Sequence, residues 1–134
     1  MLPHEAQAFL KAIQGDRLEA LFSVALAIGL RQGEALGVRW QDVDWDARII
    51  RVRYALQRIN KRLELTELKT KNSRRDLPLI ETVLVALRSH RNRQLQEKMV
   101  AGSRWQETGM VFTTTIGTPL DARNVTRKYH ALLK

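Results

Sequence analysis

Residues Ile28 to Asp44 have the sequence IGLRQGEALGVRWQDVD. Gly29 suits the left-handed conformation that commonly ends a helix. The apolar pattern after it predicts a second, short helix from residue 30 or 31 to about Val38. Arg31 is therefore expected at a junction between two helices. The final Asp-Val-Asp is typical of a turn, because aspartate side chains hydrogen-bond to nearby backbone.

Two longer helices are predicted on the N-terminal side of this stretch. Apolar residues recur at helical spacing between Pro3 and Ile13, with the proline at an early position. Gly15 is expected to end this helix. Asp16 then offers an N-cap with Glu19 in the capping-box position, and the broad apolar face that follows indicates a core helix.

The segment after Asp44 has the two-residue period of β-strands. Apolar and polar residues alternate from Ile50 to Gln57, a reversal is predicted at Asn60-Lys61, and alternation returns at residues 63–65 and 77–79. We expect a three-stranded antiparallel meander. Pro78 belongs at the end or edge of the third strand, because proline cannot donate to a ladder.

The remainder of the chain is predicted to be helical again. Glu81 to about Ala101 indicates an amphipathic surface helix, residues 110–113 form a short apolar piece, and Asp121 is expected to cap a last helix. The sequence therefore predicts one α+β domain that is mainly α-helical, with a small three-stranded antiparallel meander.

Composition favours a polyanionic partner and excludes several kinds of site. The net charge is +9 over 134 residues, and clustered basic residues are rewarded by counterion release from phosphates. There is no cysteine, and His4, His90 and His130 are far apart and expected at the surface, so we expect no metal and no cofactor. No apolar stretch is long enough to cross a membrane, and we expect a cytoplasmic protein.

Three motifs together resemble the tyrosine recombinases of the phage-integrase family. Residues Gly29 to Asp44 are similar to the family's first arginine box, Gly-Leu-Arg-x-x-Glu-x-Leu-x-Leu-x-Trp-x-Asp-Val-Asp, with Val38 in place of a leucine. Residues 69–79, KTKNSRRDLPL, look like its β-hairpin lysine motif. A weaker third match is Val111, Phe112, Gly117, Pro119 and Leu120, which precedes a helix in these enzymes.

The resemblance implies the N-terminal part of a catalytic domain that breaks and rejoins DNA through a phosphotyrosyl intermediate without a metal. Arg31 would stabilise charge on the phosphorane, since a guanidinium binds two phosphate oxygens as a planar fork. Lys69, with Lys71 as its rival, would protonate the 5′-oxygen leaving group. Glu34 lies on the same helical face as Arg31, where it could orient that arginine or contact the active-site histidine region.

Two later motifs of the family have no match in residues 1–134. These are the His-x-x-Arg box and the nucleophilic tyrosine. Neither Tyr54 nor Tyr129 matches the nucleophile, because both lie upstream of where that box would begin. We therefore expect a partial integrase catalytic domain that is inactive alone, with a catalytically inactive DNA-binding or protein-interaction remnant as the alternative. The fragment is expected to expose apolar surface and to self-associate. The parent enzyme is expected to assemble as a tetramer on DNA.

The basic residues gather on the predicted sheet and its hairpin. We expect double-stranded DNA, and no small-molecule substrate, to contact this region through largely sequence-tolerant phosphate contacts. The residues expected to bind DNA are Arg51, Arg53, Lys69, Lys71, Arg74 and Arg75.

Overall fold

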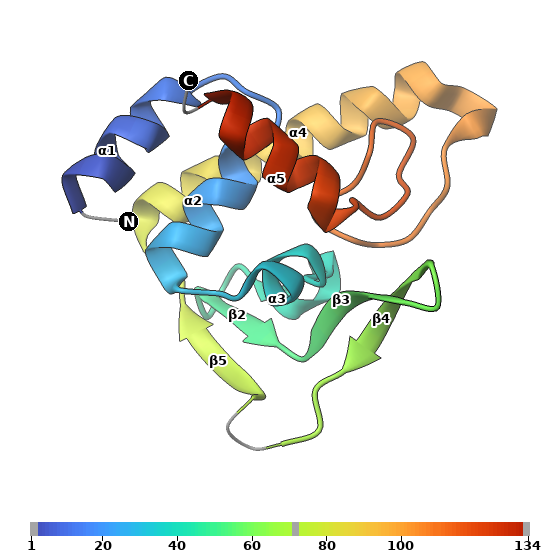
Figure 1. Cartoon of the computed structure of the whole chain (residues 1–134), viewed down its shortest axis with the longest axis horizontal. Coiled ribbons are helices and arrows are strands. Elements are labelled where there is room, and N and C mark those ends of the chain that lie inside the picture. The colour runs from blue at the N-terminus through green and yellow to red at the C-terminus, as the bar shows by residue number, and fades with distance from the viewer. Residues whose placement is uncertain (1–2, 71–72, 133–134) are drawn as a thin grey trace.

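The computed structural model describes residues 3–70 and 73–132, which form helices on one side and short antiparallel strands on the other (Figure 1). In chain order the elements are α1 (Pro3–Ala12), α2 (Glu19–Ile28), α3 (Gln32–Leu36), the 3-10 helix η1 (Trp40–Asp42), β1 (Val43–Asp44), β2 (Ile49–Val52), β3 (Tyr54–Ile59), β4 (Arg62–Glu67), β5 (Arg75–Pro78), α4 (Glu81–Ala101), the 3-10 helix η2 (Gly102–Arg104) and α5 (Ala122–Leu132). The predicted α+β class is confirmed.

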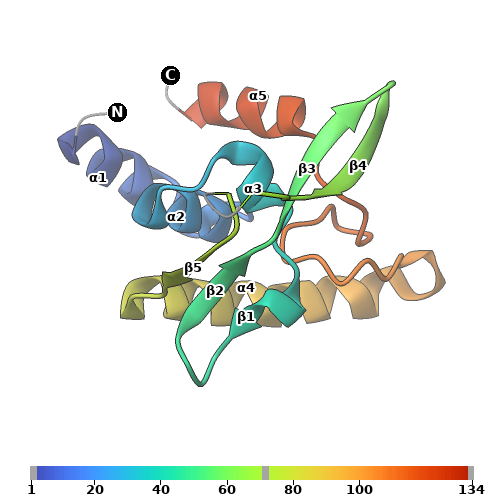
Figure 2. The same ribbon diagram turned by 90° about the horizontal axis from the view of Figure 1, so that it is seen from below.

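The longer helices and the strands lie on different sides of the molecule. In Figure 1, α1, α2, α4 and α5 lie in the upper part, and α3 lies with the strands in the lower part. Figure 2 shows α5 and α4 at opposite edges of the helical part. Helix α2 packs against α4, and its Leu21 and Val24 are buried in the core. The side chain of Asp16 accepts a hydrogen bond from the Leu18 amide at 3.0 Å, so α2 begins at Glu19, two residues later than a cap at Asp16 would place it.

The strands do not form the expected meander. The predicted first strand is divided at Arg53, which belongs to no strand: β2 pairs with β1 and β5, whereas β3 pairs with β4. The burial pattern changes phase at the same place, because Val52 is buried and the next buried residues are Ala55 and Leu56. The turn at Asn60-Lys61 is confirmed, with positive φ at both residues as a two-residue hairpin turn requires.

Helix α3 lies directly on the backbone of β3. A Cβ placed on Gly37 would lie 2.9 Å from the Tyr54 carbonyl oxygen and 3.0 Å from the Leu56 nitrogen, and one on Gly33 would lie 3.1 Å from the Leu56 carbonyl oxygen. Only glycine permits this approach. These two glycines therefore explain why the buried face of the strand shifts: Ala55, expected to point outward, is covered by α3.

The residues between α4 and α5 complete the core. The amide of Val111 donates to the carbonyl of Val38 at 3.0 Å, and Gln94 donates to the carbonyls of Met110 and Val111. His90, expected at the surface, is 5% exposed, and its Nε2 lies 2.6 Å from the Val111 carbonyl oxygen. Burial lowers the pKa of His90. His90 has the helical spacing of the core residues of α4 and is buried with them. Its polarity is tolerated there because a backbone carbonyl forms a hydrogen bond with its ring nitrogen Nε2.

Candidate active-site and DNA-contact residues

Arg31 occupies the N-cap of α3. Gly29, with φ 75°, ends α2 and turns the chain, so that Arg31 follows in an extended conformation. The residue is exposed, and within the described part of the chain its guanidinium has no hydrogen-bond or ion-pair partner. The predicted position at a helix junction is confirmed, and the guanidinium is available to an external ligand.

Glu34 joins this helix start to the strand β5. Its Oε1 accepts a hydrogen bond from the backbone amide of Arg31 at 3.0 Å, and its two carboxylate oxygens accept from the Arg75 guanidinium at 2.8 and 2.9 Å. Glu34 is only 3% exposed. The hydrogen bonds from Arg75 hold the pKa of Glu34 below its ordinary value, and the same contact raises the pKa of Arg75.

Glu34 therefore orients two arginines in different ways. It holds the main chain of Arg31 and the side chain of Arg75, which the sequence assigned to DNA contact. The Arg75 guanidinium also donates to the Ser73 carbonyl oxygen at 3.0 Å. Sequence reasoning missed this pair, because two charges 41 residues apart carry no periodic signal.

Lys69 lies in the connection between β4 and β5. It is exposed, and its ammonium makes no hydrogen bond or ion pair with another residue that the structure describes. The connection is braced from inside by the Leu68 amide, which donates to the Arg53 carbonyl at 2.8 Å, and by the hydroxyl pair of Thr70 and Ser73 at 2.6 Å. Lys71, the alternative to Lys69, lies outside the described residues.

Glu34 links the start of β5 to the start of α3. Arg75 ends the connection that carries Lys69, and Glu34 binds both Arg75 and the amide of Arg31. The strand connection that carries Lys69 is thereby joined, through Arg75 and Glu34, to the helix start at Arg31.

Most of the arginines assigned to DNA contact already have acidic partners. Arg51 binds Asp44 at 2.8 Å, Arg53 binds Asp76 at 2.7 Å, and Arg74 binds Glu67. These pairs are partly exposed, so each contributes little to stability and can be exchanged for another anion. The sheet therefore presents less unpaired positive charge than its sequence indicates.

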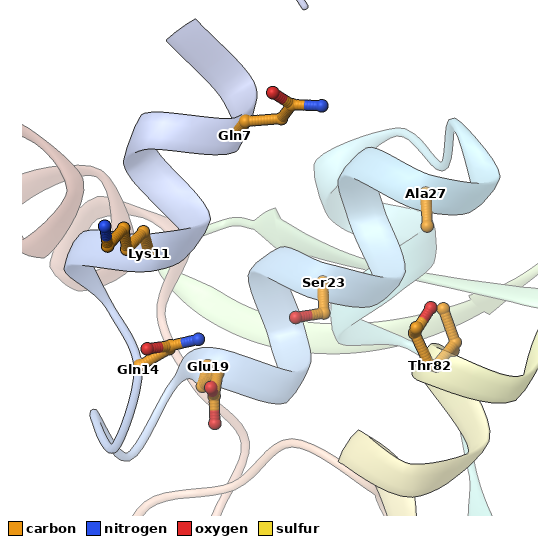
Figure 3. A pocket seen from close by; sticks show the side chains of 8 residues that line it. Gln7, Lys11, Gln14, Glu19, Ser23, Ala27 and Thr82 are labelled. Atoms are coloured by element: carbon orange, nitrogen blue, oxygen red, sulfur yellow. The ribbon is translucent and has the colours of Figure 1, made fainter. Parts of the chain in front are cut away.

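A hollow at the other side of the helices does not contain these residues. It has a volume of about 520 Å³ and lies among α1, α2 and the start of α4, where Lys11, Glu19, Ser23 and Thr82 face it (Figure 3). Arg31 and Lys69 are exposed instead. Within residues 3–70 and 73–132, no group of three potential ligand side chains could hold a metal ion. None of the described helices has the length and apolarity of a membrane span.

A family model described as "Phage integrase family" matches residues 1–134. The chain belongs to the phage integrase family. This confirms the family that the arginine box and the lysine motif predicted. Among curated phage-integrase relatives, a "Tyrosine recombinase XerC-like" protein of Caldanaerobacter subterraneus subsp. tengcongensis is 38% identical over 96% of this chain and 36% of its own length. An "Integrase" of Streptomyces ambofaciens is 35% identical over 97% of the chain and 34% of its own length.

Solved integrases and recombinases have the same fold. The Tn1549 transposon integrase in complex with circular intermediate DNA matches with a TM-score of 0.75 and 24% identity, over 98% of this chain and 44% of that one. The XerA recombinase matches with a TM-score of 0.72 and 25% identity, over 98% and 40%. The chain spans about a third of the length of the curated relatives above.

Proposed function

We propose that this chain contributes Arg31 and Lys69 to the scissile phosphate in a site-specific DNA recombinase. The supporting observation is the Glu34–Arg75 pair, which ties the loop of Lys69 to the helix start of Arg31. Both candidate cations are exposed, and neither makes a side-chain hydrogen bond or ion pair with a described residue, although the charge of Arg31 acts on Glu34. A duplex approaching this surface would meet two unpaired cations joined by a buried brace.

The two cations suit different steps of phosphoryl transfer. A guanidinium stays charged at any working pH and can bind two nonbridging oxygens, so Arg31 would stabilise the charge of the pentacoordinate phosphorane. Such a donor contributes about 3 kcal/mol of transition-state stabilisation. An ammonium on a surface loop can give a proton to the 5′-oxygen as the bond to phosphorus breaks, which is the role of Lys69.

The nucleophile and the His-x-x-Arg box would come from sequence other than residues 1–134. Tyr54 supports this, because its ring lies under the Arg39 guanidinium at 4.1 Å and so serves packing. The chain would act on DNA in the cytoplasm, within a tetramer assembled on DNA and without a small-molecule substrate. The alternative, an inactive DNA-binding remnant, would have the same surface. A recombination assay of a complete protein that contains this chain would distinguish the two, because the remnant would be inactive.

We expect duplex DNA to bind this chain with an affinity that falls steeply with salt. With about four phosphate contacts, affinity should drop roughly a hundredfold between 50 and 200 mM salt. Lys69→Ala should lower the slope of log affinity against log salt by about one. Fluorescence anisotropy of a labelled duplex measures both. Lys11→Ala, which removes an exposed lysine from α1, is the matched control and should keep the slope; a salt-independent affinity would contradict the proposal.

The 134-residue chain by itself should form no covalent product. A nicked suicide duplex, which traps the phosphotyrosyl link by losing a short strand, should give no slower band on a denaturing gel. The reason is that the His-x-x-Arg box and the nucleophilic tyrosine of the family have no match in residues 1–134. A covalent adduct that survives Tyr54→Phe and disappears in Tyr129→Phe would overturn this expectation.

A further inference from the structure

All three tryptophans of the protein lie along one side of α4. Trp40 and Trp45 stack with ring centroids 6.3 Å apart, and Trp105 follows η2 at the far end of the helix. Two shallow hollows, of about 350 and 170 Å³, run between these rings and α4, and both are lined by Arg91. The tryptophan groove is defined here as the surface of Trp40, Trp45, Trp105, Arg88, Arg91 and Leu95.

Two arginines of the groove have no acidic partner, because the one acid among the described residues that line it, Glu107, pairs with Lys98 at 2.7 Å. The Arg88 guanidinium lies 5.9 Å from the Trp45 ring centroid, and that of Arg91 lies 5.5 Å from the Trp40 centroid. Within the described residues neither arginine has a hydrogen-bond or ion-pair partner. This differs from the sheet, where Arg51, Arg53, Arg74 and Arg75 are paired.

An exposed apolar stripe runs beside the groove. Val85, Leu95 and Met99 are 51%, 53% and 82% exposed. They lie on one face of α4 together with Arg88 and Asn92, because these five positions are separated by three and four residues in turn. This is the spacing at which one helix meets another. Tryptophan and arginine beside apolar residues are the composition of protein interface centres.

We propose that the tryptophan groove binds an acidic, amphipathic helix of a partner protein. Carboxylates of the partner would pair with Arg88 and Arg91, and its apolar residues would cover Leu95 and Met99. A second copy of this chain fits poorly, because its net charge is also +9. Duplex DNA fits poorly as well, because a phosphate backbone leaves an apolar stripe uncovered. The proposal is independent of Arg31 and Lys69.

Intrinsic tryptophan fluorescence reports on this site directly, because every tryptophan of the protein lines it. The probe is a synthetic helical peptide of about 20 residues with leucine at three- and four-residue spacing and glutamate elsewhere. We expect a saturable change in emission. Arg88→Glu with Arg91→Glu should weaken binding at least about tenfold. The matched control, Lys11→Glu with Arg127→Glu, makes the same change in net charge on other helices and should leave peptide affinity unchanged.

Three outcomes would overturn the proposal. One is an emission spectrum that does not change up to roughly 1 mM peptide, because a dissociation constant above about 1 mM is too weak for a specific interface. Another is equal binding of a scrambled peptide of the same composition. The third is a single-stranded oligonucleotide that binds more tightly than the peptide and loses affinity in the same double variant, which would assign the groove to base stacking. Anisotropy with a labelled duplex is measured on the same variants, so that a failure of DNA binding is told apart from a failure at the groove.

Discussion

Glu34→Gln is expected to lower the free energy of unfolding by about 2 kcal/mol. Breaking a buried ion pair usually costs more, about 3–5 kcal/mol, because one charge is left without a partner. Here the loss is reduced because the Arg75 side chain is 30% exposed and water can reach its guanidinium. Urea unfolding followed by circular dichroism measures the difference.

Asp76→Asn is the matched control for this change. It removes the carboxylate from another arginine pair of the same strand β5, where the two side chains are 31% and 47% exposed. Exposed pairs contribute at most about 1 kcal/mol, so the control should remain close to the parent protein. Equal losses in the two variants would show that the Glu34–Arg75 pair is not a special brace.

The same pair gives the pH dependence a definite sign. The pKa of Glu34 is lowered on folding, so its contribution to stability is complete above the ordinary value of 4.5 and is lost as pH falls through the lowered value. Between neutral pH and about 4.5, the difference in free energy of unfolding between the parent protein and Glu34→Gln should be constant. As the pH falls further, through the lowered pKa of Glu34, this difference should become smaller. A gap that widened in acid would contradict this assignment.

Gly37→Ala is expected to lower the free energy of unfolding by about 1–3 kcal/mol, the usual cost of overpacking. The new methyl would lie 2.9 Å from the Tyr54 carbonyl oxygen and 3.1 Å from the Ala55 Cα, and these backbone atoms cannot turn aside as a side chain can. Gly37 has φ −91°, a conformation that any residue can adopt. The loss in free energy of unfolding would therefore come from the contact of the new methyl with the backbone of β3 and not from backbone strain. Thermal unfolding provides the measurement.

Gly33→Ala provides the graded comparison in the same helix. Its methyl would meet one carbonyl oxygen at 3.1 Å and the Ala55 side chain at 3.7 Å, which is less crowded than at Gly37. We expect a smaller loss, partly offset because alanine favours a helix over glycine. A larger loss at Gly33 than at Gly37 would mean that α3 does not lie on β3 as described.

Local signals predicted the helices well and the contacts between them less well. The bounds of α1 and α4, the helix end at Gly29, the cap at Asp121 and the turn at Asn60-Lys61 follow from spacing and from single residues. The motif around Arg31 predicted the family. These features depend on neighbours within a few positions, which a sequence displays directly.

The features that sequence reasoning missed depend on distant neighbours. The strand from Ile50 to Gln57 alternates without a break in the sequence, but it divides at Arg53, and α3 lies on the backbone of residues 54–56 just beyond that point. The acidic partners of the arginines, and the buried carbonyl that satisfies His90, come from segments remote in the chain. The role of each cation at a phosphate stays a prediction, since charge alone does not identify a ligand.

The division at Arg53 makes β3 and β4 a two-stranded ribbon of their own. The ribbon of β3 and β4 is fixed at its base, residues 54–56, where α3 covers it, while residues 57–62 around its turn are exposed. Residues added in pairs at the Asn60-Lys61 turn lengthen such a ribbon and keep every side chain on its original face. Related chains can therefore differ in how far this arm extends while the helix junction beneath it stays the same.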